Sequence, residues 1–292
     1  LNYLLVPLYT SKGVFEPAEY GVITSLYAWT AFLNVVLTFG METTFFRFSN
    51  HENVELANEK GGAVFTTSAY ALLFSSVAFM LLGSGFSGRI AQGIGFPAYG
   101  TSVLLLVIII GIDALTTVPM ARLRQQGRAW RFATINILSV VVNVVLNLFI
   151  FLYCMKKFNA GETNAVIDAV YDPSFGVGYV FLINLISTGV KLVILLPEWP
   201  PFKAFSKTLL RTLLAFGAPL MVAGLAGMVN ETADRIILKY LLPEDIADAQ
   251  IGIYGACYKL AVLITLFIQA FRMGAEPFFF SHAKEKNSRE TF

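Results

Sequence analysis

The residues most able to do chemistry in this sequence are charged side chains inside an apolar segment. Asn230, Glu231, Asp234 and Arg235 fall within six residues of the segment 213–243, which is otherwise mostly apolar. Spacings of three and four residues place Glu231, Asp234 and Arg235 on one face of a helix. An ionisable group at the centre of a membrane helix costs roughly 2.5–3.5 kcal/mol, so this face is expected to look into a helix bundle or a water-filled cavity.

Five basic side chains within or next to apolar segments are candidates for binding an anion. They are Arg47, Lys191, Arg235, Lys259 and Arg272. Arginine suits phosphate because its planar guanidinium donates two parallel hydrogen bonds. Each candidate also has a structural interpretation. Arg47, Lys191 and Arg272 can extend to lipid headgroups, and Arg235 can pair with Glu231 within its own helix.

Five acidic side chains are candidates for coupling an ion or for balancing charge. They are Glu42, Asp113, Glu231, Asp234 and Glu276. Asp113 is the deepest, within VIIIGIDALTTVPM. A carboxylate inside the membrane can bind a proton or a sodium ion and couple it to a conformational change, and it can equally neutralise a nearby arginine. Both interpretations stay open at this stage.

The sequence lacks the usual patterns of a catalytic or cofactor site. It has no phosphate loop, no zinc-ligand spacing and no nucleophile elbow. His51 and His282 are isolated in polar segments, and Cys154 and Cys257 have no motif spacing. A net charge of only +2 gives no case for nucleic acid. We therefore predict no catalytic residue, no metal and no cofactor, and a protein that is not an enzyme.

The composition is that of a membrane protein. Of the 292 residues, 56% are hydrophobic and 14% charged, whereas soluble domains carry about 25% charged residues. Apolar runs of a length that crosses a bilayer as a helix predict eight spans. They are residues 1–10, 22–41, 61–86, 101–120, 132–153, 175–197, 213–242 and 252–273. Because an open sheet cannot span lipid, we expect an all-α protein, and we interpret the first span as the second half of a helix in a longer chain.

The basic residues between the spans predict the orientation. Loops after the second, fourth, sixth and eighth spans hold 12 Lys and Arg, and the alternate loops hold 5. Since cytoplasmic loops carry the excess of positive charge, the even-numbered loops and the N-terminal side are expected to be cytoplasmic.

The sequence also contains an internal repeat. Sliding the chain along itself by 234 residues aligns Tyr20-Gly21 with Tyr254-Gly255, Gly40 with Gly274, Glu42 with Glu276, and Phe45-Phe46 with Phe279-Phe280. The second span then corresponds to the eighth, and the first to the seventh. Both copies enter the membrane from the same side, so the repeat is parallel. Two six-helix lobes related by an axis along the membrane normal are a common transporter plan.

Several of these segments resemble a known family. The resemblance is carried by LLVPLYT, PAEYGVITSLYA, GMETTFFRF, residues 118–149, DRIILKYLLP, GIYGACYKLA and QAFRMGAEPFFF. They are similar to bacterial polysaccharide biosynthesis proteins, the Wzx-type oligosaccharide flippases of the multidrug/oligosaccharidyl-lipid/polysaccharide exporter superfamily. The resemblance implies a MATE-like fold of 12 or 14 helices in two lobes. Residues 1–197 would be the first lobe, 198–212 a cytoplasmic linker, and 213–292 the start of the second lobe.

The resemblance also implies a function. Such a protein flips an oligosaccharide on undecaprenyl pyrophosphate across the bacterial inner membrane by alternating access, for lipopolysaccharide, capsule, exopolysaccharide or peptidoglycan synthesis. Its partners would be the lipid bilayer, the lipid-linked oligosaccharide and the machinery that polymerises the polysaccharide.

Two other functions are open. One is a drug or cation antiporter of the same superfamily, against which the cationic candidates argue, because a cation exporter needs a mainly acidic and aromatic cavity. The other is an integral membrane polysaccharide ligase or polymerase. Such enzymes usually carry large outside loops with catalytic polar residues, whereas the outside loops expected here are short.

Overall fold

The computed structural model describes residues 2–50, 54–162, 164–200 and 205–282, and the part it describes is helical throughout, without a β-strand. Within these described residues, six helical segments are long and apolar enough to cross a membrane. They are Pro17–Ser49, Gly62–Gly85, Pro97–Gln125, Ala129–Asn159, Gly178–Glu198 and Lys207–Leu241. This confirms an all-α integral membrane protein. The six segments correspond to the second to seventh predicted spans. The first and eighth predicted spans fall on the helices α1 (Asn2–Tyr9) and α12 (Glu244–His282), which are not among these six segments.

Helix α2 (Pro17–Thr38) begins and ends for identifiable local reasons. Pro17 occupies its first turn, where the missing N–H costs nothing, and the Glu19 carboxylate accepts a 2.9 Å hydrogen bond from the Glu16 N–H in a capping box. The helix ends where Phe39 and Gly40 adopt left-handed backbone angles, with φ of 52° and 63°. The predicted span 22–41 therefore starts earlier and is divided, because α3 (Met41–Asn50) continues from this break.

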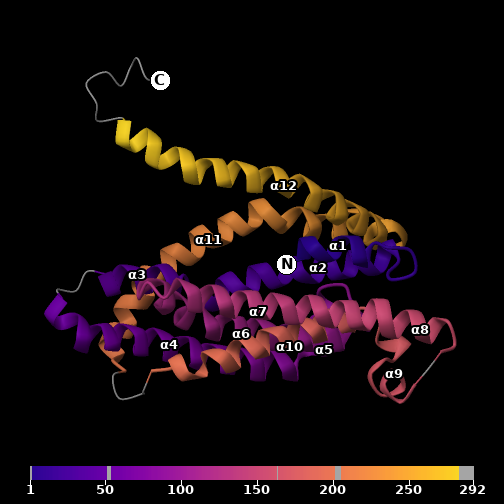
Figure 1. Cartoon of the computed structure of the whole chain (residues 1–292), viewed down its shortest axis with the longest axis horizontal. Coiled ribbons are helices and arrows are strands. Elements are labelled where there is room, and N and C mark those ends of the chain that lie inside the picture. Colours follow the sequence, from indigo (N-terminus) through magenta and orange to yellow (C-terminus); the bar gives the residue numbers. More distant parts are fainter. Residues whose placement is uncertain (1, 51–53, 163, 201–204, 283–292) are drawn as a thin grey trace.

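Helices α2, α4 (Val54–Gly85), α6 (Gly100–Gln125), α7 (Ala129–Leu148) and α10 (Gly178–Leu195) pack together as an N-terminal bundle (Figure 1). Short elements join them: α5 (Ser87–Gly93), α8 (Met155–Asn159), α9 (Ala165–Val170), three 3-10 turns (Pro97–Tyr99, Pro173–Phe175 and Leu196–Glu198) and the π-turn Phe149–Cys154.

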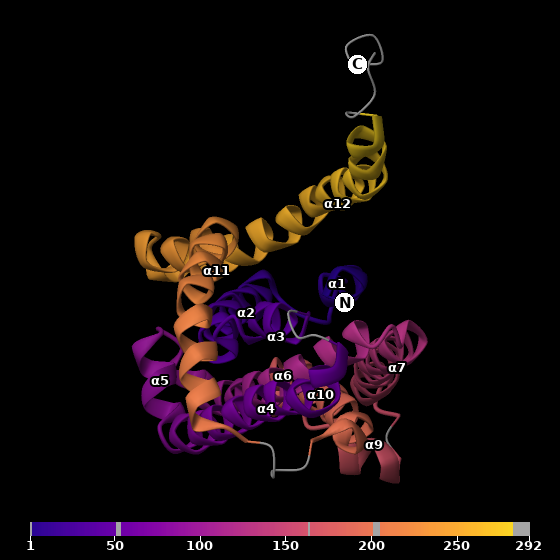
Figure 2. The same cartoon turned by 90° about the vertical axis from the view of Figure 1, so that its left-hand side faces the viewer.

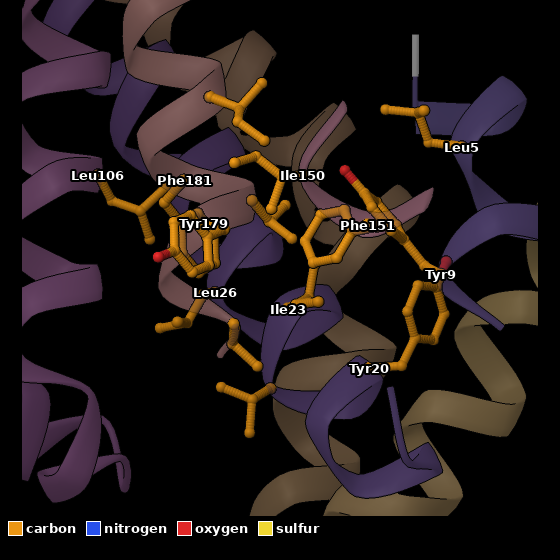
Figure 3. Packing of buried hydrophobic residues seen from close by; sticks show 14 of the residues in the cluster. Leu5, Tyr9, Tyr20, Ile23, Leu26, Leu106, Ile150, Phe151, Tyr179 and Phe181 are labelled. Atoms are coloured by element: carbon orange, nitrogen blue, oxygen red, sulfur yellow. The ribbon is translucent and has the colours of Figure 1, made fainter. Parts of the chain in front are cut away.

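The core of this bundle gathers buried apolar side chains from α2, α6, α10 and the π-turn Phe149–Cys154. Ile23 and Leu26 of α2 lie near Phe181 and Tyr179 of α10, as Figure 3 shows. Lipid tails are as apolar as leucine, so the hydrophobic effect does not drive such helices together. Close van der Waals packing and interhelical hydrogen bonds have to hold this bundle.

A buried hydrogen-bond chain supplies part of that cohesion. The Tyr9 hydroxyl donates to Asn147 Oδ1 at 2.6 Å, Asn147 Nδ2 donates to Asn143 Oδ1 at 3.1 Å, and Asn143 Nδ2 donates to Ser187 Oγ at 2.9 Å. The chain connects α1 with α7 and α10. Because all four side chains are buried, each would otherwise expose a polar group to an apolar environment.

The two last helices pack on α2 at different heights. Helix α11 (Lys207–Leu241) begins at the N-cap Ser206, so residues 207–212 are already helical. It approaches the C-terminal end of α2 closely, since a Cβ at Gly40 would lie 2.8 Å from the Leu220 Cβ. Helix α12 packs against the N-terminal end of α2 and then leads away from the bundle (Figures 1 and 2).

Candidate functional site

A small open cavity with several polar and charged side chains in its lining lies where α2, α11 and α12 meet. Its volume is about 150 Å³. The lining residues are Thr24, Tyr27, Ala28, Glu231, Thr232, Arg235, Tyr258 and Lys259. The cavity brings together three of the ten charged residues that the sequence singled out, namely Arg235, Lys259 and Glu231. Asp234 precedes Arg235 in the chain and is not part of the lining.

Arg235 is held at this cavity by contacts other than a close ion pair. Only 8% of the residue is exposed. Its Nη1 donates to the backbone carbonyl of Glu231 at 2.8 Å, and the guanidinium carbon lies 4.1 Å from the centre of the Tyr258 ring. The nearest carboxylate is Asp234, with Oδ1 3.6 Å from Nη1, and Asp234 also accepts a hydrogen bond from the Tyr254 hydroxyl. Arg235 therefore contacts Glu231 through the backbone, and its weak ion pair is with Asp234.

Lys259 is the second cation of the cavity, and it has a neutral partner. Its Nζ donates a 2.9 Å hydrogen bond to the Tyr20 hydroxyl across the contact between α12 and α2. Among the described side chains, the ion pairs within 4 Å do not include Lys259. A half-buried ammonium without a carboxylate carries an unbalanced positive charge, which favours an anionic ligand.

Asp113 and Lys191 form a separate charged group between α6 and α10. They lie near enough to interact electrostatically, although not as a close ion pair. Tyr27 lines the cavity and is also within electrostatic range of Asp113. The Tyr27 hydroxyl accepts a 3.1 Å hydrogen bond from Asn184 Nδ2.

The remaining candidates lie away from the cavity or outside the described side chains. Glu42 accepts a 2.7 Å hydrogen bond from Arg124 at the exposed end of α6. The Arg47 guanidinium lies 4.8 Å from the centre of the Phe216 ring on α11. Arg272 and Glu276 belong to α12, but their side chains lie outside the part of the chain that the structure describes.

Sequence reasoning missed the polar aromatic side chains of the site. Tyr20, Tyr27 and Tyr258 are three of 12 tyrosines, and tyrosine is common in any membrane protein at the lipid–water interface. The internal repeat held the one available signal, because it aligned Tyr20 with Tyr254. In the structure both tyrosines contact a charged residue, Lys259 and Asp234 respectively.

A comparison with known protein families identifies the family of this chain. The model of the family "Polysaccharide biosynthesis protein" matches residues 1–281. The chain belongs to this family. Members of the polysaccharide biosynthesis family are typically transporters or flippases. With six apolar helices long enough to cross a bilayer, this member is a multi-pass membrane protein of polysaccharide biosynthesis. Searches among curated proteins and among solved structures found no match.

Proposed function

We propose that the protein flips an oligosaccharide linked to undecaprenyl pyrophosphate across the bacterial inner membrane by alternating access, for cell-surface polysaccharide synthesis. The observation that supports this most directly is the pair of cations, Arg235 and Lys259, at one cavity in a membrane protein of this family. We place the N-terminal side in the cytoplasm, following the distribution of Lys and Arg. The hairpin between α11 and α12 then faces outside.

The chemistry of the cavity suits a pyrophosphate. Moving such an anion through a bilayer requires cations that replace its hydration, because an isolated charge in an apolar medium costs many kcal/mol. Arg235 stacks on Tyr258 and keeps further N–H donors beyond the one used by the Glu231 carbonyl. Lys259 can exchange the neutral Tyr20 hydroxyl for a phosphate oxygen, and charge-assisted hydrogen bonds are roughly twice as strong as neutral ones.

The size of the cavity limits what it can hold. At about 150 Å³ it is smaller than the roughly 300–1,000 Å³ of pockets for drug-sized ligands. We therefore assign it the pyrophosphate alone. Tyr27, Thr24 and Thr232 complete the lining of this cavity. The sugars would extend beyond the cavity, and the polyprenyl tail would stay in lipid.

Asp113 has a part in this proposal as the ion-coupling candidate of the first lobe. Its neighbour Lys191 partly neutralises it, so charge balance is its resting role. Protonation of Asp113 would leave the positive charge of Lys191 without a counter-charge. Tyr27, which lines the cavity, would be the side chain exposed to this change in electrostatic potential. On the outer face, the delivered oligosaccharide would pass to the machinery that polymerises it.

The site argues against the two other functions. A cation exporter would place acidic groups at the cavity without competing cations, whereas Arg235 and Lys259 both line it. A ligase or polymerase needs a general base or nucleophile near the substrate. The described lining of the cavity contains no histidine, cysteine or serine, and Glu231 is its single carboxylate.

The test is a flipping assay in proteoliposomes with a fluorescent undecaprenyl-pyrophosphate-linked sugar. Arg235→Ala and Lys259→Ala are each expected to lower the initial rate at least about tenfold, the equivalent of about 1.4 kcal/mol. Arg89→Ala is the matched control, because Arg89 is exposed and contacts the ring of Phe86 outside the cavity. Wild-type rates in both cavity variants would contradict the proposed pyrophosphate site.

A further inference from the structure

A second and larger cavity lies on the other side of the α2–α12 contact. This groove has a volume of about 460 Å³ and is formed by the connection between α1 and α2, the start of α2 and residues 252–257 of α12. Its lining residues are Thr10, Ser11, Lys12, Gly13, Phe15, Glu16, Pro17, Tyr20, Gly252, Ile253, Ala256 and Cys257. Its polar side chains are one lysine, one glutamate, two aliphatic hydroxyls, a tyrosine and a cysteine. The glutamate, Glu16, accepts a backbone hydrogen bond in the capping box of α2.

Tyr20 separates this groove from the cavity of Arg235 and Lys259. It contributes to the floor of the groove, while its hydroxyl accepts the hydrogen bond of Lys259, which lines the cavity. Tyr20 is only 2% exposed. One hydrogen-bonded pair of side chains therefore divides two polar spaces.

Close contact between the α2 and α12 backbones on both sides of Tyr20 leaves little room for another passage between the groove and the cavity. A Cβ at Gly252 would overlap the carbonyl oxygen of Pro17, and a Cβ at Gly255 would lie 2.7 Å from the Thr24 Cγ2. The two helices thus touch directly above and below Tyr20. Further along, α12 leads away from α2 (Figure 1). The two helices are therefore in close contact only at the end where the groove lies.

We propose that Tyr20 and Lys259 form a gate between the two spaces, and that the groove is the exit subsite for the anionic sugar-phosphate headgroup. This rests on the proposed function, since it assigns successive positions to the same substrate. An arriving phosphate competes with the Tyr20 hydroxyl for the Lys259 ammonium and replaces a neutral acceptor by a charged one. Tyr20 is then released from Lys259, and the helices lose the polar contact that joins them at this level.

The groove offers what a phosphate and a sugar need after the gate opens. Lys12 supplies the cation, and it is absent from the ion pairs within 4 Å that the described residues form. The Thr10 and Ser11 hydroxyls donate to the backbone carbonyls of Val6 and Leu8, which leaves their oxygens free to accept hydrogen bonds from sugar hydroxyls. A phosphate that moves to the groove would leave Arg235 and Lys259 and contact the solvent-exposed Lys12 instead, which favours release.

The native cysteines allow a direct test of the gate. Cys257 is exposed and lines the groove, whereas Cys154 is buried. In a variant with both cysteines replaced by serine, Thr232→Cys places a thiol in the cavity beyond the gate. Whole cells are treated with a membrane-impermeant maleimide. The labelling rate of Cys257 is measured in the Cys154→Ser variant and is compared with that of the Thr232→Cys thiol in the double-serine background. We expect Cys257 to react at least about tenfold faster.

Opening the gate should remove that difference. Tyr20→Ala is expected to raise labelling of the Thr232→Cys thiol at least fivefold. Smaller rises are expected for Tyr20→Phe, which removes only the hydrogen bond, and for Lys259→Met, which removes the ammonium and keeps an unbranched side chain. Tyr240→Ala is the control, since Tyr240 is an exposed tyrosine of α11 outside both spaces. Unchanged labelling in Tyr20→Phe and Lys259→Met would overturn the gate, even if Tyr20→Ala fails to fold.

The exit subsite has its own readout, with inorganic pyrophosphate as the probe. Pyrophosphate is expected to slow labelling of Cys257 several-fold, and Lys12→Gln should abolish this protection. Absence of protection in the parent protein would overturn the exit subsite. The gate measurements need no transported substrate. The labelling results can therefore support the gate even if the flipping assay contradicts the proposed function, and this distinguishes the two proposals.

Discussion

The guanidinium of Arg235 lies 4.1 Å from the centre of the Tyr258 ring, so a buried arginine of α11 is covered by an aromatic face of α12. Its Nη1 donates to the Glu231 carbonyl one helical turn away. A cation over an aromatic face gains about 0.5–2 kcal/mol, with the larger values where water is excluded. Arg235 is therefore held in position without spending its charge on a close carboxylate, which is the condition a binding site for an anion requires.

Replacing Tyr258 should separate the contribution of the ring from that of the hydroxyl. Tyr258→Phe keeps the aromatic face and is expected to flip substrate within about threefold of the parent rate. Tyr258→Leu loses the cation–π contact of about 0.5–2 kcal/mol, so the substrate concentration for half-maximal flipping should rise roughly 2- to 30-fold. Equal behaviour of the Phe and Leu variants would show that the stacking does not position Arg235.

Glu198 should contribute measurably to stability. Its carboxylate pairs with Arg128 at 2.9 Å and with Arg131 at 2.8 Å, and only 12% of its side chain is exposed. The two arginines are about 40% exposed, so solvent screens part of the interaction. We expect Glu198→Gln to cost about 1–2 kcal/mol, because charged hydrogen bonds contribute about 1.5–3 kcal/mol each when unscreened. The melting temperature in detergent should fall by roughly 2–5 °C.

The matched control for Glu198 is Glu162→Gln. The Lys157 ammonium lies 2.8 Å from the Glu162 carboxylate and holds the pKa of that carboxyl below its ordinary value. Both side chains are exposed to solvent, and such pairs contribute little to stability. The melting temperature of this variant should match the parent. A fall equal to that of Glu198→Gln would mean that burial does not decide the effect.

The spans could be predicted from the sequence because length and hydropathy determine them. Apolar runs located all six segments that can cross a bilayer, within several residues at each end. The break at Phe39 and Gly40 was not predictable, since the apolar run continues through it. It depends on close contact with Leu220 of α11, which a Cβ at Gly40 would obstruct. Tertiary packing of distant segments therefore sets this boundary.

The charged residues of the candidate site could be predicted from the sequence, but the residues that contact them could not. Arg235, Glu231 and Lys259 stood out because charge inside an apolar segment is rare. One interpretation left open by the sequence was a pair between Arg235 and the Glu231 side chain, and the structure shows Arg235 donating to the Glu231 backbone carbonyl. Tyr20 was not found, because the contact that gives it a role joins residues 239 positions apart.

The buried chain of hydrogen bonds through Asn147 should show energetic coupling between α1 and α7. Tyr9→Phe removes the donor and Asn147→Leu removes the acceptor of the 2.6 Å bond. A double-mutant cycle in lipid bicelles should give a coupling energy of about 0.6 kcal/mol and up to about 1.7 kcal/mol, the range of interhelical bonds in membranes. As a control, Tyr153→Phe combined with Asn147→Leu should be additive, because Tyr153 is exposed.

Gly252 should be irreplaceable at the crossing of α2 and α12, whereas Gly227 of α11 should not. A Cβ at Gly252 would overlap the Pro17 carbonyl oxygen and lie 3.0 Å from the Gly21 N, and a Cβ at Gly227 would meet no atom within 4 Å. Gly252→Ala must push the helices apart, which breaks the hydrogen bond between Lys259 and Tyr20. Gly227→Ala should be neutral or stabilising by about 0.5–1 kcal/mol, since alanine favours a helix more than glycine does. Thermal unfolding in detergent, with flipping measured in parallel, compares the two; equal stability and equal activity of both variants would contradict a close crossing at Gly252.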